Sequence, residues 1–423
     1  FEGYMKIMKA IWTLLLLLPL ALLAQQYTLD ELVEHGLVNS YGMLRGELAY
    51  ETSRSNLSSA TWNLLPEAGV SFGITNNFYH PNTPAASDLS SQAGFSISKT
   101  ISLNDDAWFN YRYAKLDAEK AELTRQSNAS AYAYGVFTAY LDVLSTQRQL
   151  SSLQKNLEIQ TRVWEQAQVL NQLGKNTSFD LKESEIAVMN ARISILQLEN
   201  SIASKRAQLF SLARMDDAGY ELAELAPDMN YVLPQTSPEQ SNQVKLLKAD
   251  LKRGELGLTQ NFLNYFPRVS LAYNFSRSVG GENFDFDTYG TNHTLGLNFS
   301  YSLWNQFKQG QTNKRGDLAQ RLAELEIRQQ IDEINQQYAT LSQELAYLTR
   351  LDKLYSEKLA HSESQIRIAE ERFRLGLIEL LELDKTRVEF INSEIAYNNN
   401  RYQILARQEA INNLLSQKIQ GKW

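Results

Sequence analysis

Cysteine is absent from this sequence of 423 residues. The chain therefore offers no disulfide, no thiolate metal ligand, no cysteine nucleophile and no cysteine to which a lipid could be attached. Histidine is scarce: the four histidines are scattered, and none forms the HExxH pair of zinc hydrolases. A P-loop and a GxSxG turn are also missing. We therefore predict no catalytic residue, no cofactor and no metal site, and a protein that is not an enzyme.

Proline and glycine are few for this length, at 8 and 20 residues, which suits long uninterrupted elements. A basic surface is also lacking, because the formal net charge is −7. This balance argues against a nucleic-acid-binding protein, which would need a basic face. The remaining composition, 43% hydrophobic and 21% charged, is that of a folded chain and not of a disordered one.

Only one long apolar run exists, and it lies at the beginning of the sequence. Lys6 and Lys9 precede a leucine-rich stretch that ends in the small residue Ala24 before polar Gln25. The pattern predicts a secretory signal peptide over residues 1–24. An uncleaved membrane anchor is the less favoured alternative, because a spanning helix needs roughly 20 apolar residues. We expect an exported protein, in which any crossing of a membrane has to use strands.

The rest of the sequence contains an internal duplication of one unit. Leu65-Pro66, Gly94 and Leu173-Gly174 have counterparts in Phe266-Pro267, Gly296 and Leu375-Gly376, at a nearly constant offset. We predict a first repeat over 25–215, a proline-containing linker over 216–238 and a second repeat over 239–423. Each repeat is expected to contain a helix, two strands, a long helix and a return helix.

Two segments in each repeat alternate apolar with small polar residues, the period of a β-strand. They predict strands at about 66–76, 93–103, 267–277 and 293–304, with Lys99 breaking the alternation in the second. One face of a soluble β-sandwich would give the same pattern. The strand length and the small polar second face instead favour strands that cross a membrane. Four strands cannot close a barrel, so two, three or four copies of the chain would have to share one.

Aromatic residues gather next to these strands, where an interfacial girdle would lie. The candidate girdle residues are Trp108, Phe109, Tyr111, Trp304 and Phe307.

The other segments predict very long helices. Apolar residues recur at alternating spacings of three and four from Ile331 to Phe373, interrupted only by Asp352 and Ser362, which indicates a coiled-coil seam. The long helices are expected over about 106–173 and 306–375, each about 100 Å long at 1.5 Å per residue. Shorter helices are predicted over about 29–60, 178–213, 238–264 and 379–419.

Gly174 and Gly376 are predicted to end the two long helices as left-handed caps. Thr177 and Asp180 form a capping pair for the first return helix, whereas the second, which begins near Glu379, lacks such a pair.

At this point the sequence resembles the TolC-like outer-membrane efflux proteins over essentially the whole mature chain. The resemblance is carried by the Leu-Pro and Phe-Pro strand openings at 65–66 and 266–267, the strands that run into long helices, and the glycine tips at 173–181 and 373–377. It implies a mainly α fold with membrane β. Each chain would supply four transmembrane strands to the 12-stranded β-barrel of a homotrimer, continued by a long α-helical coiled-coil barrel in the periplasm.

The implied function is an exit duct of a tripartite efflux or type I secretion system in the outer membrane of a Gram-negative bacterium. Its partners would be a periplasmic adaptor (membrane fusion) protein, an inner-membrane pump and outer-membrane lipid. A periplasmic coiled-coil structural or adhesion protein is the alternative that stays open.

Two sets of site residues follow from this resemblance. Acidic residues after the tips are candidates for a ring at the pore constriction: Asp180 and Glu382 first, then Glu183, Glu379 and Asp384. Residues at the tips are candidates for contact with the adaptor: Leu173, Gly174, Lys175, Leu375, Gly376 and Leu377.

Overall fold

The computed structural model describes residues 26–76, 89–99, 104–174, 177–235, 237–280 and 290–422. The predicted signal peptide at 1–24 and the tip residue Lys175 lie outside these ranges. The described chain forms two compact units, and each combines segments from both halves of the sequence. The unit that contains residues 26–44, 127–237 and 334–422 is called the helical unit. The other, with residues 45–126 and 238–333, is called the sheet unit.

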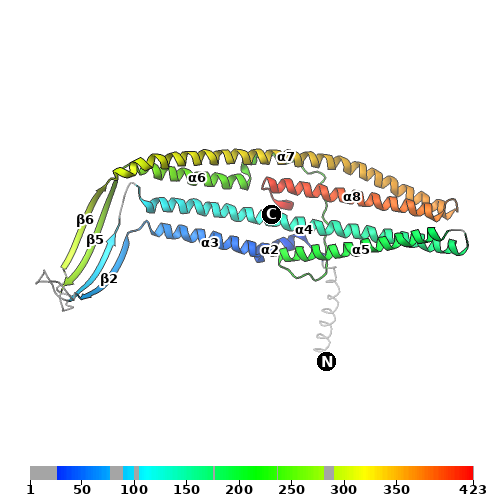
Figure 1. Cartoon of the computed structure of the whole chain (residues 1–423), viewed down its shortest axis with the longest axis horizontal. Coiled ribbons are helices and arrows are strands. Elements are labelled where there is room, and N and C mark those ends of the chain that lie inside the picture. Colours follow the sequence, from blue (N-terminus) through cyan, green and yellow to red (C-terminus); the bar gives the residue numbers. More distant parts are fainter. Residues whose placement is uncertain are drawn as a thin grey trace, which may run out of the picture. The chain divides into compact units, whose positions relative to one another are not determined.

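The same order of elements occurs twice along the chain (Figure 1). In the first half, helices α2 (Leu29–Asn39) and α3 (Tyr41–Trp62) precede strands β2 (Glu67–Asn76) and β3 (Leu89–Ser98), then α4 (Asp106–Gln172) and α5 (Ser178–Ala213). In the second half, α6 (Asn242–Leu263) precedes β5 (Arg268–Gly280) and β6 (Gly290–Ser300), then α7 (Leu303–Arg374) and α8 (Leu380–Leu414). The two-residue strands β1 (Gln26–Tyr27) and β4 (Glu221–Leu222) and the short turns η2 (Pro238–Gln240) and η4 (Ile419–Gly421) complete the chain.

The sheet unit is built on a four-stranded antiparallel sheet in the order β2-β3-β5-β6. Strand β3 lies about four residues earlier than the alternation predicts, and Lys99 follows its end. Pairing explains the shift: β2 begins at Glu67, after Pro66, and Glu67 pairs with Ser98. Because Lys99 has no partner on β2, its ammonium instead donates to the carbonyl of Asn63 at 3.2 Å, beyond the end of α3.

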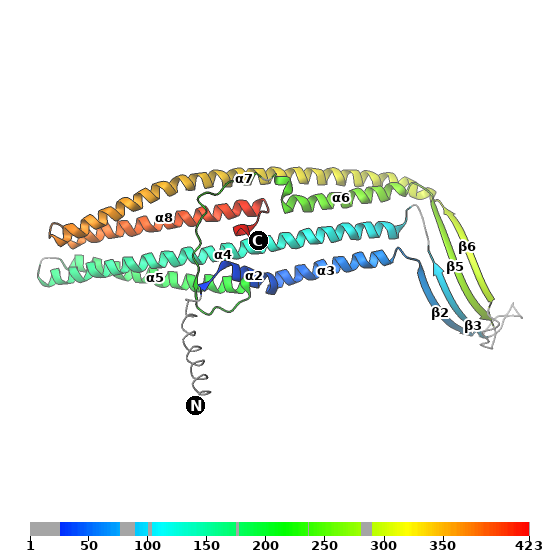
Figure 2. The same ribbon diagram turned by 180° about the vertical axis from the view of Figure 1, so that it is seen from behind.

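Within the sheet unit, α6 connects the first parts of the two long helices. Its Arg253 and Asp250 form ion pairs with Asp117 and Lys120 of α4. On its other side, the carbonyl of Asn261 accepts a hydrogen bond from Gln309 of α7 at 2.5 Å. Both views of the ribbon show α6 beside α7 (Figures 1 and 2).

The predicted long helices are confirmed as single elements, α4 with 67 residues and α7 with 72. The predicted seam of α7 is also confirmed, because Ile334, Leu345, Leu348 and Ala369 are buried. Asp352, the polar interruption of that seam, is buried too and accepts a hydrogen bond from Asn400 of α8 at 3.4 Å. Within the described ranges, no helix has the length and apolarity to span a membrane.

The helix expected over about 29–60 is interrupted, which corrects the prediction. Ser40 has an extended backbone (φ −73°, ψ 139°) and separates α2 from α3. Its hydroxyl accepts the N–H of Met43 at 3.4 Å, so Ser40 starts the second helix as a cap. Before the break, Gly36 lies so close to Tyr132 that a Cβ atom would clash with the ring hydroxyl at 1.6 Å.

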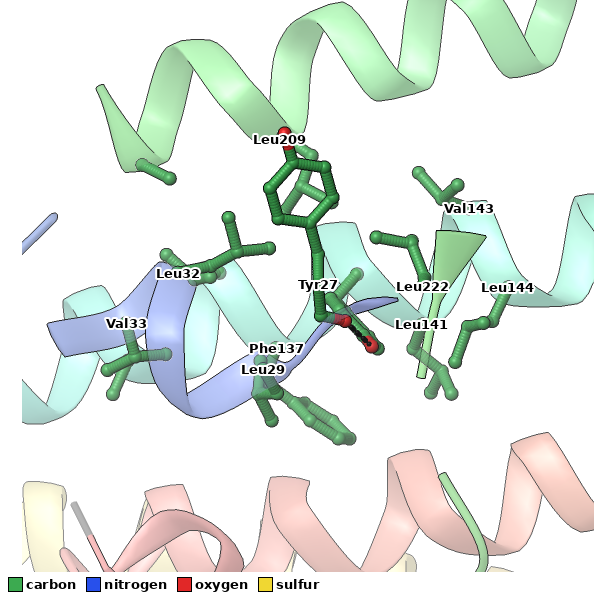
Figure 3. Packing of buried hydrophobic residues seen from close by; sticks show 14 of the residues in the cluster. Tyr27, Leu29, Leu32, Val33, Phe137, Leu141, Val143, Leu144, Leu209 and Leu222 are labelled. Atoms are coloured by element: carbon green, nitrogen blue, oxygen red, sulfur yellow. Dashed lines mark hydrogen bonds between the residues drawn. The ribbon is translucent and has the colours of Figure 1, made fainter. Parts of the chain in front are cut away.

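The core of the helical unit surrounds the first described residues of the chain. Strand β1 pairs in parallel with β4, and Tyr27 packs edge-on against Phe210. The hydroxyl of Tyr140 lies 2.9 Å from the carbonyl of Tyr27 and 2.6 Å from that of Ala223, which ties both strands to α4. Figure 3 shows the apolar side chains of α2, α4, α5 and the two strands packed around Tyr27.

Candidate functional site

One face of the sheet is apolar and uncovered. Along the edge strand β2, Val70, Phe72 and Ile74 point to the same side, and Val70 is 86% exposed. Along the other edge strand, Leu295 and Leu297 do the same, with Leu297 75% exposed. The apolar face continues over the two inner strands. Val70 lies opposite Phe95 of β3, and the ring of Phe95 contacts that of Phe275 on β5, with 6.2 Å between the ring centroids. An apolar face of this extent is unfavourable in water.

The other face of the sheet carries small and polar residues. On β2 they are Gly69, Ser71, Gly73 and Thr75, and on β6 they are Thr294, Gly296, Asn298 and Ser300. The outer strands β2 and β6 each pair on one side only among the described residues. Within the described residues, the sheet thus has one apolar face, one polar face and two unpaired edges.

The apolar face also carries a polar pair, which the sequence analysis did not predict. The hydroxyl of Tyr273 and Nδ1 of His293 are 2.9 Å apart on neighbouring strands. Strand register places His293 beside Phe275, with ring centroids 4.9 Å apart. His293 falls on the apolar phase of β6, which is the signal that could have identified it.

The five girdle candidates differ in their exposure. Trp304 (80%), Phe307 and Trp108 are exposed, and Tyr111 is partly buried. Phe109, in contrast, is completely buried, and Trp108 packs edge-on against it at 4.9 Å. Phe109 therefore supports the neighbouring indole from inside and does not fit a girdle residue that faces lipid.

In the helical unit, the two hairpin tips have the same backbone turn. Gly174 has φ +70° and Gly376 has φ +71°, which confirms both predicted left-handed caps. Leu173 is exposed beside the first glycine, and Leu375 and Leu377 are exposed around the second. Five of the six predicted contact residues thus lie at the two tip turns, and the sixth, Lys175, lies outside the described ranges.

The acidic residues of the first tip lie on α5. Thr177 and Asp180 form a complete capping box, in which the Thr177 hydroxyl accepts the Asp180 N–H at 3.2 Å and the Asp180 carboxylate accepts the Thr177 N–H at 3.1 Å. Hydrogen bonds from Thr177 lower the pKa of the Asp180 carboxyl below its usual range. The ionised form of Asp180 is therefore favoured. The side chain is partly exposed, and Glu183 is exposed one turn further along.

The acidic residues of the second tip lie on α8 and behave differently. Glu379 is the N-cap residue but makes no side-chain capping bond, as expected. Glu379 and Glu382 are exposed. Asp384 is only 1% exposed, so within the chain it belongs to the interior of the hairpin and not to its surface.

Asp384 is the centre of a buried charge cluster that sequence analysis missed. Its Oδ1 accepts a hydrogen bond from Arg387 at 3.2 Å, and Arg387 also pairs with Glu370 of α7 at 3.2 Å. Its Oδ2 and the Nε of Arg162 on α4 are both buried without a hydrogen-bond partner. Burial raises the pKa of the Asp384 carboxyl, and the positive charges of Arg387 and Arg162 oppose that rise. The i,i+3 spacing of Asp384 and Arg387 was visible in the sequence, but the contribution of Arg162 depends on the packing of α4 against α8.

A sheet with one apolar face and long helices that end in hairpin tips form a fold that several solved structures share. The fold is shared by VceC, an outer membrane protein of Vibrio cholerae (TM-score 0.78, 11% identity, 92% of this chain and 96% of that chain). It is also shared by the CmeC outer membrane channel of Campylobacter jejuni (TM-score 0.72, 15% identity, 92% and 85%) and by the open state of the MtrE outer membrane channel of Neisseria gonorrhoeae (TM-score 0.76, 14% identity, 93% and 90%). At these identities the similarity establishes the fold alone. No curated protein sequence matches the chain significantly.

A match of the sequence to a protein-family model identifies the family. The model of the outer membrane efflux protein family matches residues 32–213 and again 233–417, so the chain belongs to that family. The family places the chain in the outer membrane, with a part that extends into the periplasm. Its members are trimeric channels that work with adaptor and pump proteins, and they are not enzymes. The predicted resemblance is thereby confirmed.

Proposed function

We propose that the chain is the passive exit duct of a tripartite efflux or type I secretion assembly. Three copies would join their four-stranded sheets into a 12-stranded barrel through the outer membrane. The helices would form a coiled-coil barrel in the periplasm, reached by an adaptor that is supplied by an inner-membrane pump. No chemical step is assigned to the duct, so its contribution is a wet path and control over its opening.

The observation that carries the proposal is the uncovered apolar face of a sheet with two open edges. Lipid is the environment in which residues such as Val70 and Leu297 are stable while exposed. Open edges cannot face lipid, because their backbone groups would lack partners, so β2 of one copy has to pair with β6 of the next. The small polar residues on the second face would then line the lumen.

Exposed aromatics support the same position of the sheet. Trp304 and Phe307 stand at the start of α7, directly after β6, and their rings contact each other edge-on at 5.7 Å. Trp108 stands at the start of α4. Because aromatic side chains prefer the boundary between lipid and water, we assign Trp108, Tyr111, Trp304 and Phe307 to the periplasmic girdle.

In the helical unit, we propose that acidic residues of the hairpin tips form the constriction of the duct. Asp180 and Glu382 lie in the first turn of their helices, and Glu183 and Glu379 are exposed close to them. In a trimer, each position becomes a ring of three carboxylates, which attracts cations and repels anions. Asp384 is excluded from the open ring as long as it stays in its buried cluster.

Planar-bilayer recording tests the duct and the ring together. The purified mature protein should conduct, and the double variant Asp180→Asn with Glu382→Gln should lose cation selectivity while its conductance persists. The matched control is Glu344→Gln, which removes a charge from α7 far from the tips. Absence of conductance would refute the duct, and unchanged selectivity would refute the ring alone.

The adaptor contact is assigned to Leu173, Gly174, Lys175, Leu375, Gly376 and Leu377. Large charged substitutions such as Gly174→Arg with Gly376→Arg should abolish pump-dependent resistance, because they add bulk and charge to the tip turns without filling any internal space. Trimer formation should be unaffected. Resistance that survives in this variant would place the contact elsewhere.

A further inference from the structure

An open cavity of about 520 Å³ lies in the sheet unit, where the second pair of strands joins the helices. It is bounded by the end of α6, the first residue of β5, the last residue of β6 and the beginning of α7. Both views of the ribbon show α6 ending beside the place where β6 passes into α7 (Figures 1 and 2). The described wall of the cavity includes none of the girdle, tip or constriction residues assigned above.

The wall of this cavity is positively charged. Arg268 and Lys308 are its two cations, both exposed, and no aspartate or glutamate stands among the described residues of the wall. The ion pairs of the sheet unit use other residues, so within the described part of the chain neither cation is neutralised. Two cations without a counterion in one cavity favour an anionic ligand.

The first turn of α7 adds a fixed positive potential. The helix begins at Leu303, directly before Gln306 of the cavity wall. The first N–H groups of a helix have no partner within it, and the helix dipole places partial positive charge at that end. The end of α6 has the opposite polarity, but its carbonyl groups are occupied. That of Asn264 accepts Nε2 of Gln306 at 3.5 Å, and that of Asn261 accepts Nε2 of Gln309.

A buried amide in the wall points independently to a ligand. Asn104 is 4% exposed, and its Nδ2 donates a hydrogen bond to Oδ1 of Asn264. Its own Oδ1 is buried without a hydrogen-bond partner. Because a buried acceptor without a partner is destabilising, Asn104 favours a ligand that brings a donor. The wall thus offers donors to an anion and one acceptor to an N–H or O–H group.

We propose that this cavity binds a phosphate group on a molecule that also presents an N–H or O–H donor. Arg268 and Lys308 would bind the phosphate oxygens through charge-assisted hydrogen bonds, and Oδ1 of Asn104 would accept the donor. Inorganic phosphate meets both requirements near neutral pH, because it keeps an O–H group. Sulfate meets only the first, because it is fully ionised. The site goes beyond the proposed duct, since a single chain supplies its wall.

Two sources carry this chemistry. Arg268 and Ser300 are partners in the strand register and belong to the small polar phase of their strands, so the cavity adjoins the polar face of the sheet. Solutes dissolved in water are the source on that side. Phospholipid head groups with an ammonium group are the other source, because Trp304 and Phe307 of the proposed girdle stand in the same first turns of α7.

Equilibrium dialysis with radiolabelled inorganic phosphate tests the site. The full mature chain is purified in dodecyl maltoside, a detergent without phosphorus. We expect saturable phosphate binding, and sulfate should compete about tenfold more weakly because it has no donor for Asn104. Absence of saturable binding would overturn the site. Equal competition by sulfate would overturn the role of the buried amide, and with it the proposed ligand.

The two cations provide the first variants. Arg268→Gln and Lys308→Gln should each weaken phosphate binding by about tenfold, because each removes a charge-assisted hydrogen bond. The matched control is Lys314→Gln, since Lys314 is exposed on the same helix but is not part of the wall. It should leave phosphate binding unchanged. Equal losses in the Lys308 and Lys314 variants would mean that the general charge of α7 attracts phosphate, which overturns the site.

The amide provides a variant with a different signature. Asn104→Leu should weaken phosphate binding to the level of sulfate and leave sulfate binding unchanged, because it removes the acceptor and no positive charge. A variant that keeps its preference for phosphate would contradict the proposal. If the variant is not recovered as a folded protein, the difference between phosphate and sulfate in the unmodified protein decides the question.

Reconstitution distinguishes the two sources. The protein is placed in vesicles of phosphatidylcholine alone, or of phosphatidylcholine with an equal amount of phosphatidylethanolamine. Both mixtures have no net charge, but only phosphatidylethanolamine has an N–H donor. Phosphate binding that is lost in the second mixture would support the site with a lipid head group as its occupant. Equal binding in both would support it with a dissolved phosphate, and absence of binding from both would overturn it.

Discussion

The two hairpin tips of the helical unit share a backbone but not the side chains that support it. Both long helices end at a glycine with nearly the same φ, +70° at Gly174 and +71° at Gly376. The first return helix is then started by the exposed capping box of Thr177 and Asp180. The second starts at Glu379 without a side-chain cap, and Asp384 in its second turn is buried and hydrogen-bonded to Arg387.

This difference separates what the repeat requires from what each copy has added. Reversal of the chain needs a left-handed residue, and glycine adopts that conformation without strain, so it occurs in both tips. The side chains that follow each turn, in contrast, differ. The first tip has a local capping box, whereas the second has no side-chain cap and carries the buried Asp384, hydrogen-bonded to Arg387, one turn into α8.

The largest expected effect comes from leaving the buried carboxylate unpaired. Arg387→Leu should lower the local opening free energy of residues 380–390 by about 3 kcal/mol at pH 8, because a buried charge then lacks its partner. The measurement is amide hydrogen exchange. The loss should shrink as the pH falls, since Asp384 can take up a proton.

The control for that variant is Arg374→Leu, which breaks the exposed ion pair with Glu371 in the same hairpin. It should change the exchange of residues 380–390 very little. An equal loss in both variants would mean that burial of Asp384 does not govern the second tip.

Substitution of the tip glycines should reduce stability equally in both hairpins. Gly174→Ala and Gly376→Ala should each cost about 1–2 kcal/mol of local opening free energy, because a Cβ atom strains the left-handed backbone. No further clash contributes, since an added Cβ would meet nothing within 4 Å at either position. Exchange rates of the two tip turns provide the comparison, and a cost at one tip only would contradict it.

The cap of the first tip can be removed, and one can be added to the second. Thr177→Ala should cost about 1 kcal/mol in the first turn of α5 and leave α8 unchanged. Glu379→Thr should protect the first turn of α8 by about 0.5 kcal/mol, because Glu382 already occupies the third position of a capping box. If Thr177→Ala also changed the hydrogen exchange of α8, the two tips would be coupled, which would contradict this prediction.

The smallest expected effect is the pH dependence of the stability of the two tips, which should have opposite signs. The pKa of Asp180 is lowered in the folded chain, so its contribution is present above the ordinary value near 3.8 and is lost as the pH falls through the lowered value. The pKa of Asp384 is raised, so the folded second tip retains a proton more readily and becomes more stable as the pH falls from neutral. Exchange corrected for its intrinsic pH dependence should show both trends, and Asp384→Asn should remove the second.

A large part of this molecule was predictable because its elements are long and periodic. The ends of the two long helices, both glycine caps and the Thr177–Asp180 box are local features, and the structure confirms them. The break at Ser40 was missed because a serine inside an apolar pattern is compatible with a continuous helix. The position of β3 was displaced because its end is set by pairing with Glu67 and not by its own alternation.

Local sequence patterns were enough to predict which segments are helices, where they turn, and that each strand has one apolar and one polar face. These properties depend on neighbours within a few residues, through the 3.6-residue and two-residue periods and through the freedom of glycine. The burial of Phe109 next to the exposed Trp108, and the burial of Asp384 with Arg387 beside Arg162, became clear from the packed chain alone. Burial and charge pairing between distant segments depend on which helix faces pack together, and no local pattern specifies that.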